Sequence, residues 1–233
     1  MTLKINGIEP ARARLAGVID AAAFGAVGSF RYERIKRLAD LVLAALIGLL
    51  STPLIVALAA YIWVESGSPV LTSQVRLGRW GRPFRLRKFR TLPCEALKSA
   101  DEDWSIEPVS PVMARIRRAG LDEIPQLLNV LRGEMSLVGP RPERPYFARR
   151  FERQFPLYSV RHQLRPGLTG WAQIGGWRGD TSIERRLERD LDYFRNWSLR
   201  MDLNILLRTA GMVVRGLGTI GASNEGRRNV PVV

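Results

Sequence analysis

The segment Leu41–Val64 constrains the fold more than any other part of this sequence, because its 24 residues include no charged side chain. As a straight helix it would be about 36 Å long, at roughly 1.5 Å per residue, which is enough to cross the hydrocarbon core of a membrane. Pro53 lies at its middle, however, and a proline inside a helix removes a hydrogen bond and bends the helix. The preceding Ser51 or Thr52 hydroxyl can satisfy the carbonyl that is left free, as lipid requires. We expect a break in the helix from Ser51 to Pro53.

Basic residues flank this apolar segment on both sides. Four of them precede it between positions 31 and 37, and six follow it between positions 76 and 88. Because basic loops stay on the cytoplasmic side of a membrane, this arrangement favours a hairpin that enters and leaves at the cytoplasmic face. An ordinary transmembrane helix that tolerates one proline is the alternative.

The chain as a whole is strongly basic. Its 233 residues, enough for one domain with appendages, carry 36 lysine and arginine side chains against 22 acidic ones, a net charge of +14. This charge implies an anionic partner, such as nucleic acid, anionic lipid or a phosphorylated substrate. Cys94 and His162 are the only residues of their kinds, which excludes an internal disulfide and a metal site built from cysteine and histidine.

Two adjacent carboxylates, Asp122 and Glu123, lie between clusters of arginine. Pro125 suits the first turn of a helix, because its missing N–H would be unpaired there anyway, so we expect a helix over residues 125–132 that stops at Gly133. The carboxylates would then precede a helix N-terminus, where unpaired N–H groups favour an ionised carboxylate and attract phosphate. That placement suits phosphoryl chemistry, and an ordinary helix cap is the alternative.

The cations around this pair exceed what a cap needs. Arg117 precedes the carboxylates by about one helical turn, and Arg141 follows them between two prolines that restrict the backbone and direct its side chain. A short strand is predicted over residues 84–90, where apolar and basic residues alternate. Its Lys88 and Arg90 supply cations for a diphosphate, or else form a basic edge that faces a membrane.

Several motifs closely resemble the bacterial sugar transferase family. They are the run from Leu121 to Pro142, the Lys-Phe-Arg-Thr at residues 88–91 and the Pro-Gly-Leu-Thr-Gly-Trp-Ala-Gln at residues 166–173. The resemblance covers about residues 36–209. Members of this family are monotopic membrane enzymes that start exopolysaccharide, capsule and glycoconjugate synthesis by transferring a sugar 1-phosphate to a polyprenyl phosphate.

The resemblance implies an α+β, mainly helical fold with a re-entrant helix–break–helix element in the membrane, interfacial amphipathic helices and a small cytoplasmic catalytic domain. The break at Ser51 and Pro53 is similar to the family's Ser-Pro break. The expected parts are an N-terminal arm (1–35), the membrane hairpin (36–66), the catalytic domain (67–215) and a loose C-terminal tail (216–233). The protein is expected at the cytoplasmic face of a bacterial inner membrane, with a homodimer as a candidate assembly.

The resemblance also implies the chemistry. Asp122 would attack the sugar-bearing phosphate of a UDP-sugar, release UMP and pass the phosphosugar to polyprenyl phosphate, and nucleic acid would not be a partner. Glu123 would assist as a ligand of Mg²⁺. The phosphate-binding candidates are Lys88, Arg90, Arg117 and Arg141, and the candidate substrate contacts are Gln173 and Arg178. Residues 106–113 lack the family's Asp-x-Arg and glycine, which bears on selectivity for the sugar or nucleotide.

Three C-terminal helices are predicted, and the last of them opens at residues 197–202 and ends near Gly216. Phe147, Phe151 and Phe155 recur every four residues and give an amphipathic helix up to Pro156. Its aromatic stripe faces either the core or, as the resemblance favours, the membrane interface. The second helix covers residues 182–196, with Thr181 as its N-cap and its arginines, Arg186 included, on a solvated face.

Two other functions compete with the enzyme. A membrane-anchored protein that binds anionic lipid or nucleic acid without catalysis would explain the charge and the apolar segment equally well. A family member that has lost activity would explain the departures at residues 106–113. The adjacent carboxylates, the Pro-Arg-Pro sequence and the glycine-rich loop at residues 166–173 favour the enzyme, because a binding protein needs none of them.

Overall fold

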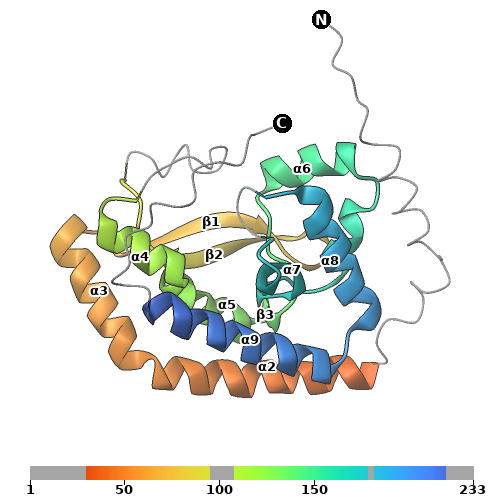
Figure 1. Cartoon of the computed structure of the whole chain (residues 1–233), viewed down its shortest axis with the longest axis horizontal. Coiled ribbons are helices and arrows are strands. Elements are labelled where there is room, and N and C mark those ends of the chain that lie inside the picture. Colours follow the sequence, from red (N-terminus) through yellow and green to blue (C-terminus); the bar gives the residue numbers. More distant parts are fainter. Residues whose placement is uncertain (1–29, 95–107, 178–180, 219–233) are drawn as a thin grey trace, which may run out of the picture.

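The computed structural model describes residues 30–94, 108–177 and 181–218. In these residues helices predominate, and the strands form two separate two-stranded sheets (Figure 1). The α-helices of the described residues are α2 (Phe30–Leu50), α3 (Thr52–Ser66), α4 (Pro111–Ala119), α5 (Leu127–Arg132), α6 (Pro145–Gln154), α7 (Trp171–Ile174), α8 (Ile183–Asn196) and α9 (Leu199–Gly218). The prediction of a mainly helical α+β fold is confirmed.

The expected break in the apolar segment is also confirmed. α2 ends at Leu50, α3 begins at Thr52, and the two axes are bent by 59°. Pro53 lies in the first turn of α3, and the Thr52 hydroxyl donates a hydrogen bond to the Gly48 carbonyl at 3.1 Å. In the part of the chain that the structure describes, no single helix is long and apolar enough to cross a membrane, whereas the bent pair satisfies both conditions together.

The two sheets differ in the direction of their strands. β1 (Leu71–Leu77) and β2 (Pro83–Phe89) form an antiparallel hairpin in which Thr72 pairs with Lys88. β3 (Ser136–Val138) pairs in parallel with β4 (Gly167–Thr169). β2 matches the strand expected over residues 84–90, and its Phe84 and Leu86 join the main core with residues of α5 and α8.

The aromatic stripe of α6 faces the core, so the expectation of an interfacial helix is wrong. Phe147 and Phe151 are only 6% and 8% exposed, and they pack against Tyr158, Leu187 and Leu191. Aromatic groups at a spacing of four residues fit a protein core and a membrane surface equally well. The partners that decide between the two are more than 30 residues away on α8.

α8 differs from its prediction in two respects. Its N-cap is Ser182, whose hydroxyl accepts a hydrogen bond from the Arg185 backbone N–H at 3.3 Å, and not Thr181. Arg186 does not lie on a solvated face, because it is only 2% exposed and its Nη1 lies 3.1 Å from Glu143 Oε2. α8 therefore brings charged groups into the interior.

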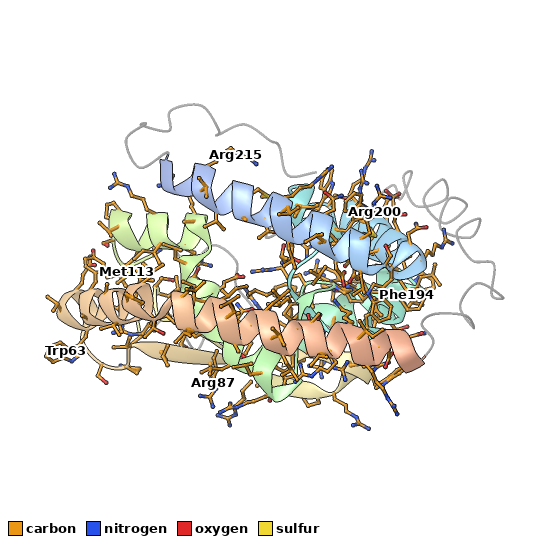
Figure 2. The ribbon with its side chains drawn as sticks, turned by 90° about the horizontal axis from the view of Figure 1, so that it is seen from below. Trp63, Arg87, Met113, Phe194, Arg200 and Arg215 are labelled. Atoms are coloured by element: carbon orange, nitrogen blue, oxygen red, sulfur yellow. The ribbon has the colours of Figure 1, made fainter. Side chains whose placement is uncertain are left out.

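α2 and α9 run along the same side of the molecule, which Figure 2 shows from below. Lys36 of α2 forms an ion pair of 2.7 Å with Asp202 of α9. Both helices expose large apolar side chains on their outer faces: Leu38, Val42, Leu46, Leu49 and Leu50 on α2, and Leu199, Leu203, Leu207 and Val214 on α9. α2 begins at Phe30, within the expected N-terminal arm, and α9 extends to Gly218, just into the expected tail; residues 1–29 and 219–233 lie outside the described residues.

Candidate active site

The two adjacent carboxylates lie in a short 3-10 helix, η5 (Leu121–Gln126). α4 ends at Ala119, and the positive φ of 75° at the following Gly120 turns the chain directly into η5. The expected start of the following helix was wrong, because α5 begins at Leu127 and not at Pro125. Its end at Gly133, with φ of 83°, is as predicted. Asp122 and Glu123 therefore belong to a helical turn of their own.

Asn129 fixes this turn against the strand that carries Lys88. Asn129 is fully buried, its side-chain amide donates to the Arg85 carbonyl at 2.8 Å, and its side-chain oxygen accepts from the Arg87 N–H at 3.1 Å. An asparagine on α5 thus pairs with β2 as a neighbouring strand would. The contact holds the carboxylates and Lys88 in one rigid unit, since β2 also packs against η5.

Glu123 is held by Arg141. Arg141 Nη2 lies 2.5 Å from Glu123 Oε1, and Nη1 lies 3.3 Å from Oε2. Burial alone would raise the pKa of Glu123, but the charge and hydrogen bonds of Arg141 lower it. Glu123 therefore stays ionised at neutral pH.

Asp122 has a different environment. Its carboxyl group is only 4% exposed, and burial, together with the negative charge of Glu123, raises its pKa to about 7. The positive charges of Lys88, Arg117 and Arg141 act in the opposite direction. Burial likewise lowers the pKa of Lys88 to about 8, with a contribution from the nearby Arg76 charge.

These electrostatic couplings show which predicted residues the fold brings together. Lys88, Arg117 and Arg141 all act on Asp122, as the phosphate-binding prediction requires. Sequence reasoning missed Arg76, which acts on both Lys88 and Glu123. Strand alternation could have found it, because Thr72 pairs with Lys88 and Arg76 follows Thr72 by four residues on the same face of β1.

Arg90 lies elsewhere and has other partners. Its Nε donates to the Pro69 carbonyl at 2.5 Å, and its Nη2 donates to the carbonyls of Ser66 and Gly67 at 2.6 Å and 2.8 Å. Arg90 is only 2% exposed. These contacts join the end of α3 to the end of β2, and they occupy the guanidinium that was predicted to bind phosphate.

Of the two candidate substrate contacts, Gln173 is the one that the structure describes. Gln173 lies on α7, is only 6% exposed, and donates to the Leu168 carbonyl at 3.0 Å. This bond supports the turn between β4 and α7. Arg178 lies outside the described residues.

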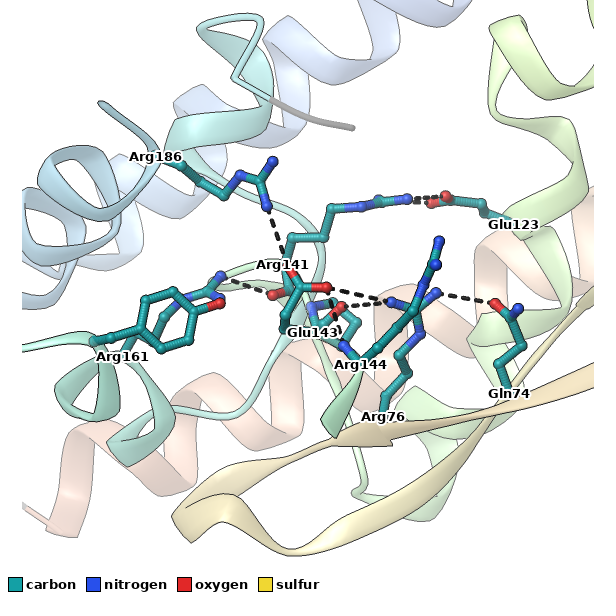
Figure 3. A network of polar contacts seen from close by, with 10 residues as sticks. Gln74, Arg76, Glu123, Arg141, Glu143, Arg144, Arg161 and Arg186 are labelled. Atoms are coloured by element: carbon teal, nitrogen blue, oxygen red, sulfur yellow. Dashed lines mark hydrogen bonds and ion pairs between the residues drawn. The ribbon is translucent and has the colours of Figure 1, made fainter. Parts of the chain in front are cut away.

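A buried network of charged side chains lies behind Arg141, and sequence reasoning missed it (Figure 3). Glu143 forms ion pairs with Arg186 of α8 and with Arg76 of β1. Arg161, in the short 3-10 helix η6 (Tyr158–Gln163), meets Asp190 of α8 at 2.8 Å. The network connects α8, β1 and η6 to the segment that carries Arg141.

The carboxylates offer a limited ligand set for a metal ion. Among the described residues, no group of three or more histidine, cysteine, aspartate or glutamate side chains is arranged to hold one. Mg²⁺ needs fewer protein ligands, because it usually keeps waters and binds through one or two carboxylates plus substrate phosphates. Asp122 and Glu123 meet this smaller requirement because both are carboxylates.

Comparisons with known proteins agree on one family. A family model described as bacterial sugar transferase matches residues 31–216. A UDP-glucose:undecaprenyl-phosphate glucose-1-phosphate transferase of Caulobacter vibrioides is 44% identical over 180 residues, which cover 75% of this chain and 67% of the relative. A protein of the same name from Escherichia coli is 41% identical over 181 residues, which cover 75% of this chain and 39% of the relative. The uncharacterized sugar transferase EpsL of Bacillus subtilis is 40% identical over 188 residues, which cover 77% of this chain and 87% of the relative.

Proposed function

The chain belongs to the bacterial sugar transferase family, and from this premise we propose that it transfers a sugar 1-phosphate from a UDP-sugar to undecaprenyl phosphate. The names of the Caulobacter and Escherichia coli relatives support these two substrates. The observation that carries the proposal is a buried Asp122, next to an ionised Glu123 and in the field of Lys88, Arg117 and Arg141.

The reaction proceeds in two displacements at phosphorus. An Asp122 carboxylate oxygen attacks the phosphorus that bears the sugar, and an O–P bond forms while the bond to the bridging oxygen breaks. UMP leaves with that oxygen and its electron pair, and the sugar phosphate remains on Asp122 as an acyl phosphate. An oxygen of undecaprenyl phosphate then attacks the same phosphorus and regenerates the carboxylate. A carboxylate suits this role because it is both a nucleophile and a good leaving group.

The surrounding cations perform most of the catalysis. Phosphoryl transfer depends chiefly on positioning and on stabilising the charge of the phosphoryl oxygens. Arg141 offers a planar fork that matches phosphate, and Lys88 and Arg117 add positive charge near Asp122. Their fields also oppose the effect of burial on Asp122, which keeps more of the nucleophile ionised.

Mg²⁺ is part of the proposal. Asp122 and Glu123 would hold the ion together with the substrate diphosphate, and the ion would offset negative charge on the phosphoryl oxygens. Glu123 keeps its charge through Arg141, so it is the stronger ligand of the two.

The bent helix pair anchors the protein at the membrane. We propose that α2 and α3 enter and leave at one face, because the uncharged residues 41–50 of α2 and 52–64 of α3 are each about one leaflet long at roughly 1.5 Å per residue, and basic residues flank both ends. α2 and α9, which both expose leucine side chains, run along the same side of the molecule (Figures 1 and 2). The lipid substrate would approach the carboxylates from that side.

One assay tests the proposal. The purified protein, in nanodiscs that contain undecaprenyl phosphate, is incubated with a panel of UDP-sugars and Mg²⁺, and UMP release is measured. We expect UMP and a lipid-linked sugar diphosphate with at least one donor. Absence of UMP with every donor would show that the chain binds these substrates or anionic lipid without catalysis.

A further inference from the structure

The backbone around Arg141 is held at four consecutive carbonyls. Pro140 and Pro142 have no N–H, so their carbonyl oxygens are the only backbone groups through which they can be hydrogen-bonded. The four donors come from three different parts of the fold: Gly167 N–H to Pro140 O at 2.9 Å, Arg161 Nη2 to Arg141 O at 2.8 Å, Arg76 Nη1 to Pro142 O at 3.4 Å, and Leu77 N–H to Glu143 O at 2.9 Å.

Of these donors, Arg161 is the one that acts on Arg141 itself. Its Nη1 donates to the Tyr158 hydroxyl at 2.7 Å, and its Nη2 lies 2.8 Å both from the Arg141 carbonyl and from Asp190 Oδ2. The side chains of Arg161 and Asp190 are only 1% and 2% exposed. Figure 3 shows Arg161 directed at the backbone from which the Arg141 side chain extends to Glu123.

The burial of the Arg161–Asp190 ion pair needs an explanation. Desolvation offsets most of the Coulombic attraction, so apolar residues of similar volume would often stabilise a fold equally well. Tyr158 and Asp190 keep Arg161 charged in spite of its burial, which alone would lower its pKa. A charged donor makes a stronger hydrogen bond to a carbonyl than a neutral one does.

We propose that Arg161, oriented by Asp190, is a positioning residue for the transfer, because it fixes the Arg141 carbonyl and so directs the Arg141 guanidinium to Glu123 and the phosphate. The inference rests on the proposed function. Neither Arg161 nor Asp190 reaches the carboxylates, and the effect passes through a chain of short contacts from Asp190 to Arg161, Arg141 and Glu123. A misplacement of about 1 Å at such a site can cost about 100-fold in rate.

Two variants and a matched control test this role. Asp190→Asn removes the charge that orients Arg161, and Arg161→Lys removes the fork that reaches three partners at once. Asp202→Asn is the control, since the same substitution there breaks a different buried ion pair, which joins α9 to Lys36 of α2. For UMP release per folded molecule, we expect kcat to fall about 10-fold or more in both test variants with KM within about twofold, as for an interaction made in the transition state. The control should keep its kcat.

A double-mutant cycle separates positioning from a general loss of structure. Once Arg141 is replaced by lysine, the direction of its side chain matters less, so Arg161→Lys should add little further loss. Additive losses in the double variant, or a kcat loss in Asp202→Asn as large as in Asp190→Asn, would overturn the proposal.

A second measurement does not depend on activity. If the wild type releases no UMP, the proposed function fails, but a crystal structure of Asp190→Asn still decides the positioning role. We expect Arg141 to lose at least one of its two contacts with Glu123 in Asp190→Asn and to keep both in Asp202→Asn. An unchanged Arg141–Glu123 pair in Asp190→Asn would refute the inference.

Discussion

Arg141 and Glu123 form a two-point ion pair, with Nη2–Oε1 at 2.5 Å and Nη1–Oε2 at 3.3 Å, across 18 residues of sequence. The pair lowers the pKa of Glu123, whereas burial raises the pKa of its neighbour Asp122 to about 7. Two adjacent carboxylates whose pKa values are separated in this way are suited to different roles. In the proposed reaction, Glu123 would remain an anion throughout, and Asp122 would be the group that changes its state.

The first prediction concerns the fork of Arg141. Arg141→Lys keeps the positive charge but cannot contact both oxygens of Glu123 or of a phosphate, so we expect a loss of about 100-fold in the rate of UMP release, similar to the loss of one transition-state donor. Arg150→Lys, an exposed change on α6, is the control. A wild-type rate in Arg141→Lys would show that the charge alone is sufficient.

The second prediction concerns stability and pH. Because the pKa of Asp122 is raised in the folded protein, its stabilising protonated form is lost as the pH rises through about 7. Asp122→Asn resembles the protonated form at every pH. We therefore expect its thermal unfolding midpoint to exceed that of the wild type at pH 8, and the difference to shrink at pH 5, in a buffer with chelator and without phosphate. If the unfolding midpoints of Asp122→Asn and the wild type differed by as much or more at pH 5, burial would not be destabilising the ionised form of Asp122.

The third prediction concerns Arg90. Its guanidinium donates to three backbone carbonyls at the end of α3, and a lysine can satisfy fewer of them. Since a buried unsatisfied carbonyl costs about 1–3 kcal/mol, Arg90→Lys should destabilise the protein by about that amount, whereas the exposed Arg82→Lys should not. The KM for the UDP-sugar, measured on the folded fraction, should stay near the wild-type value. A strong rise in KM without loss of stability would restore Arg90 to the phosphate site.

These results show how far the sequence alone could lead. The break at Pro53 was predictable because the cause is local, a missing N–H within one turn of helix. The proximity of Arg141 to the carboxylates was predicted because the motif places them in one stretch of sequence, whereas the ion pair of Arg141 with Glu123 was not. The partners of Arg90 and Arg186 were not, because they lie 21 to 24 and 43 residues away.

The periodicity of apolar residues along a helix does not identify what the apolar face contacts. The phenylalanines of α6 show that one face of the helix is apolar, but an amphipathic pattern is the same for lipid and for protein. The position of Arg186 in the helical pattern predicts a solvated side chain. The structure shows that Arg186 instead forms an ion pair with Glu143 in the interior. Long-range partners of buried charges are therefore the part of this site that required the structure.

The fourth prediction concerns the membrane segment. In a Cys94→Ser background, single cysteines replace Arg34 at the start of α2 and Arg195 at the end of α8, both of which are exposed. If α2 and α3 form a re-entrant pair, a membrane-impermeant maleimide should label neither site in intact cells and both in permeabilised cells. A spanning helix predicts that Arg34→Cys is labelled in intact cells, and that result would reject the hairpin.

Intact-mass spectrometry tests the central claim most directly. The protein is mixed with a UDP-sugar and Mg²⁺ in the absence of lipid acceptor, and Asp122→Asn is treated in the same way. We expect the wild type to gain the mass of one sugar phosphate, to lose it when undecaprenyl phosphate is added, and Asp122→Asn never to gain it. Release of UMP by a protein that remains at its original mass, or an adduct on Asp122→Asn, would contradict the account.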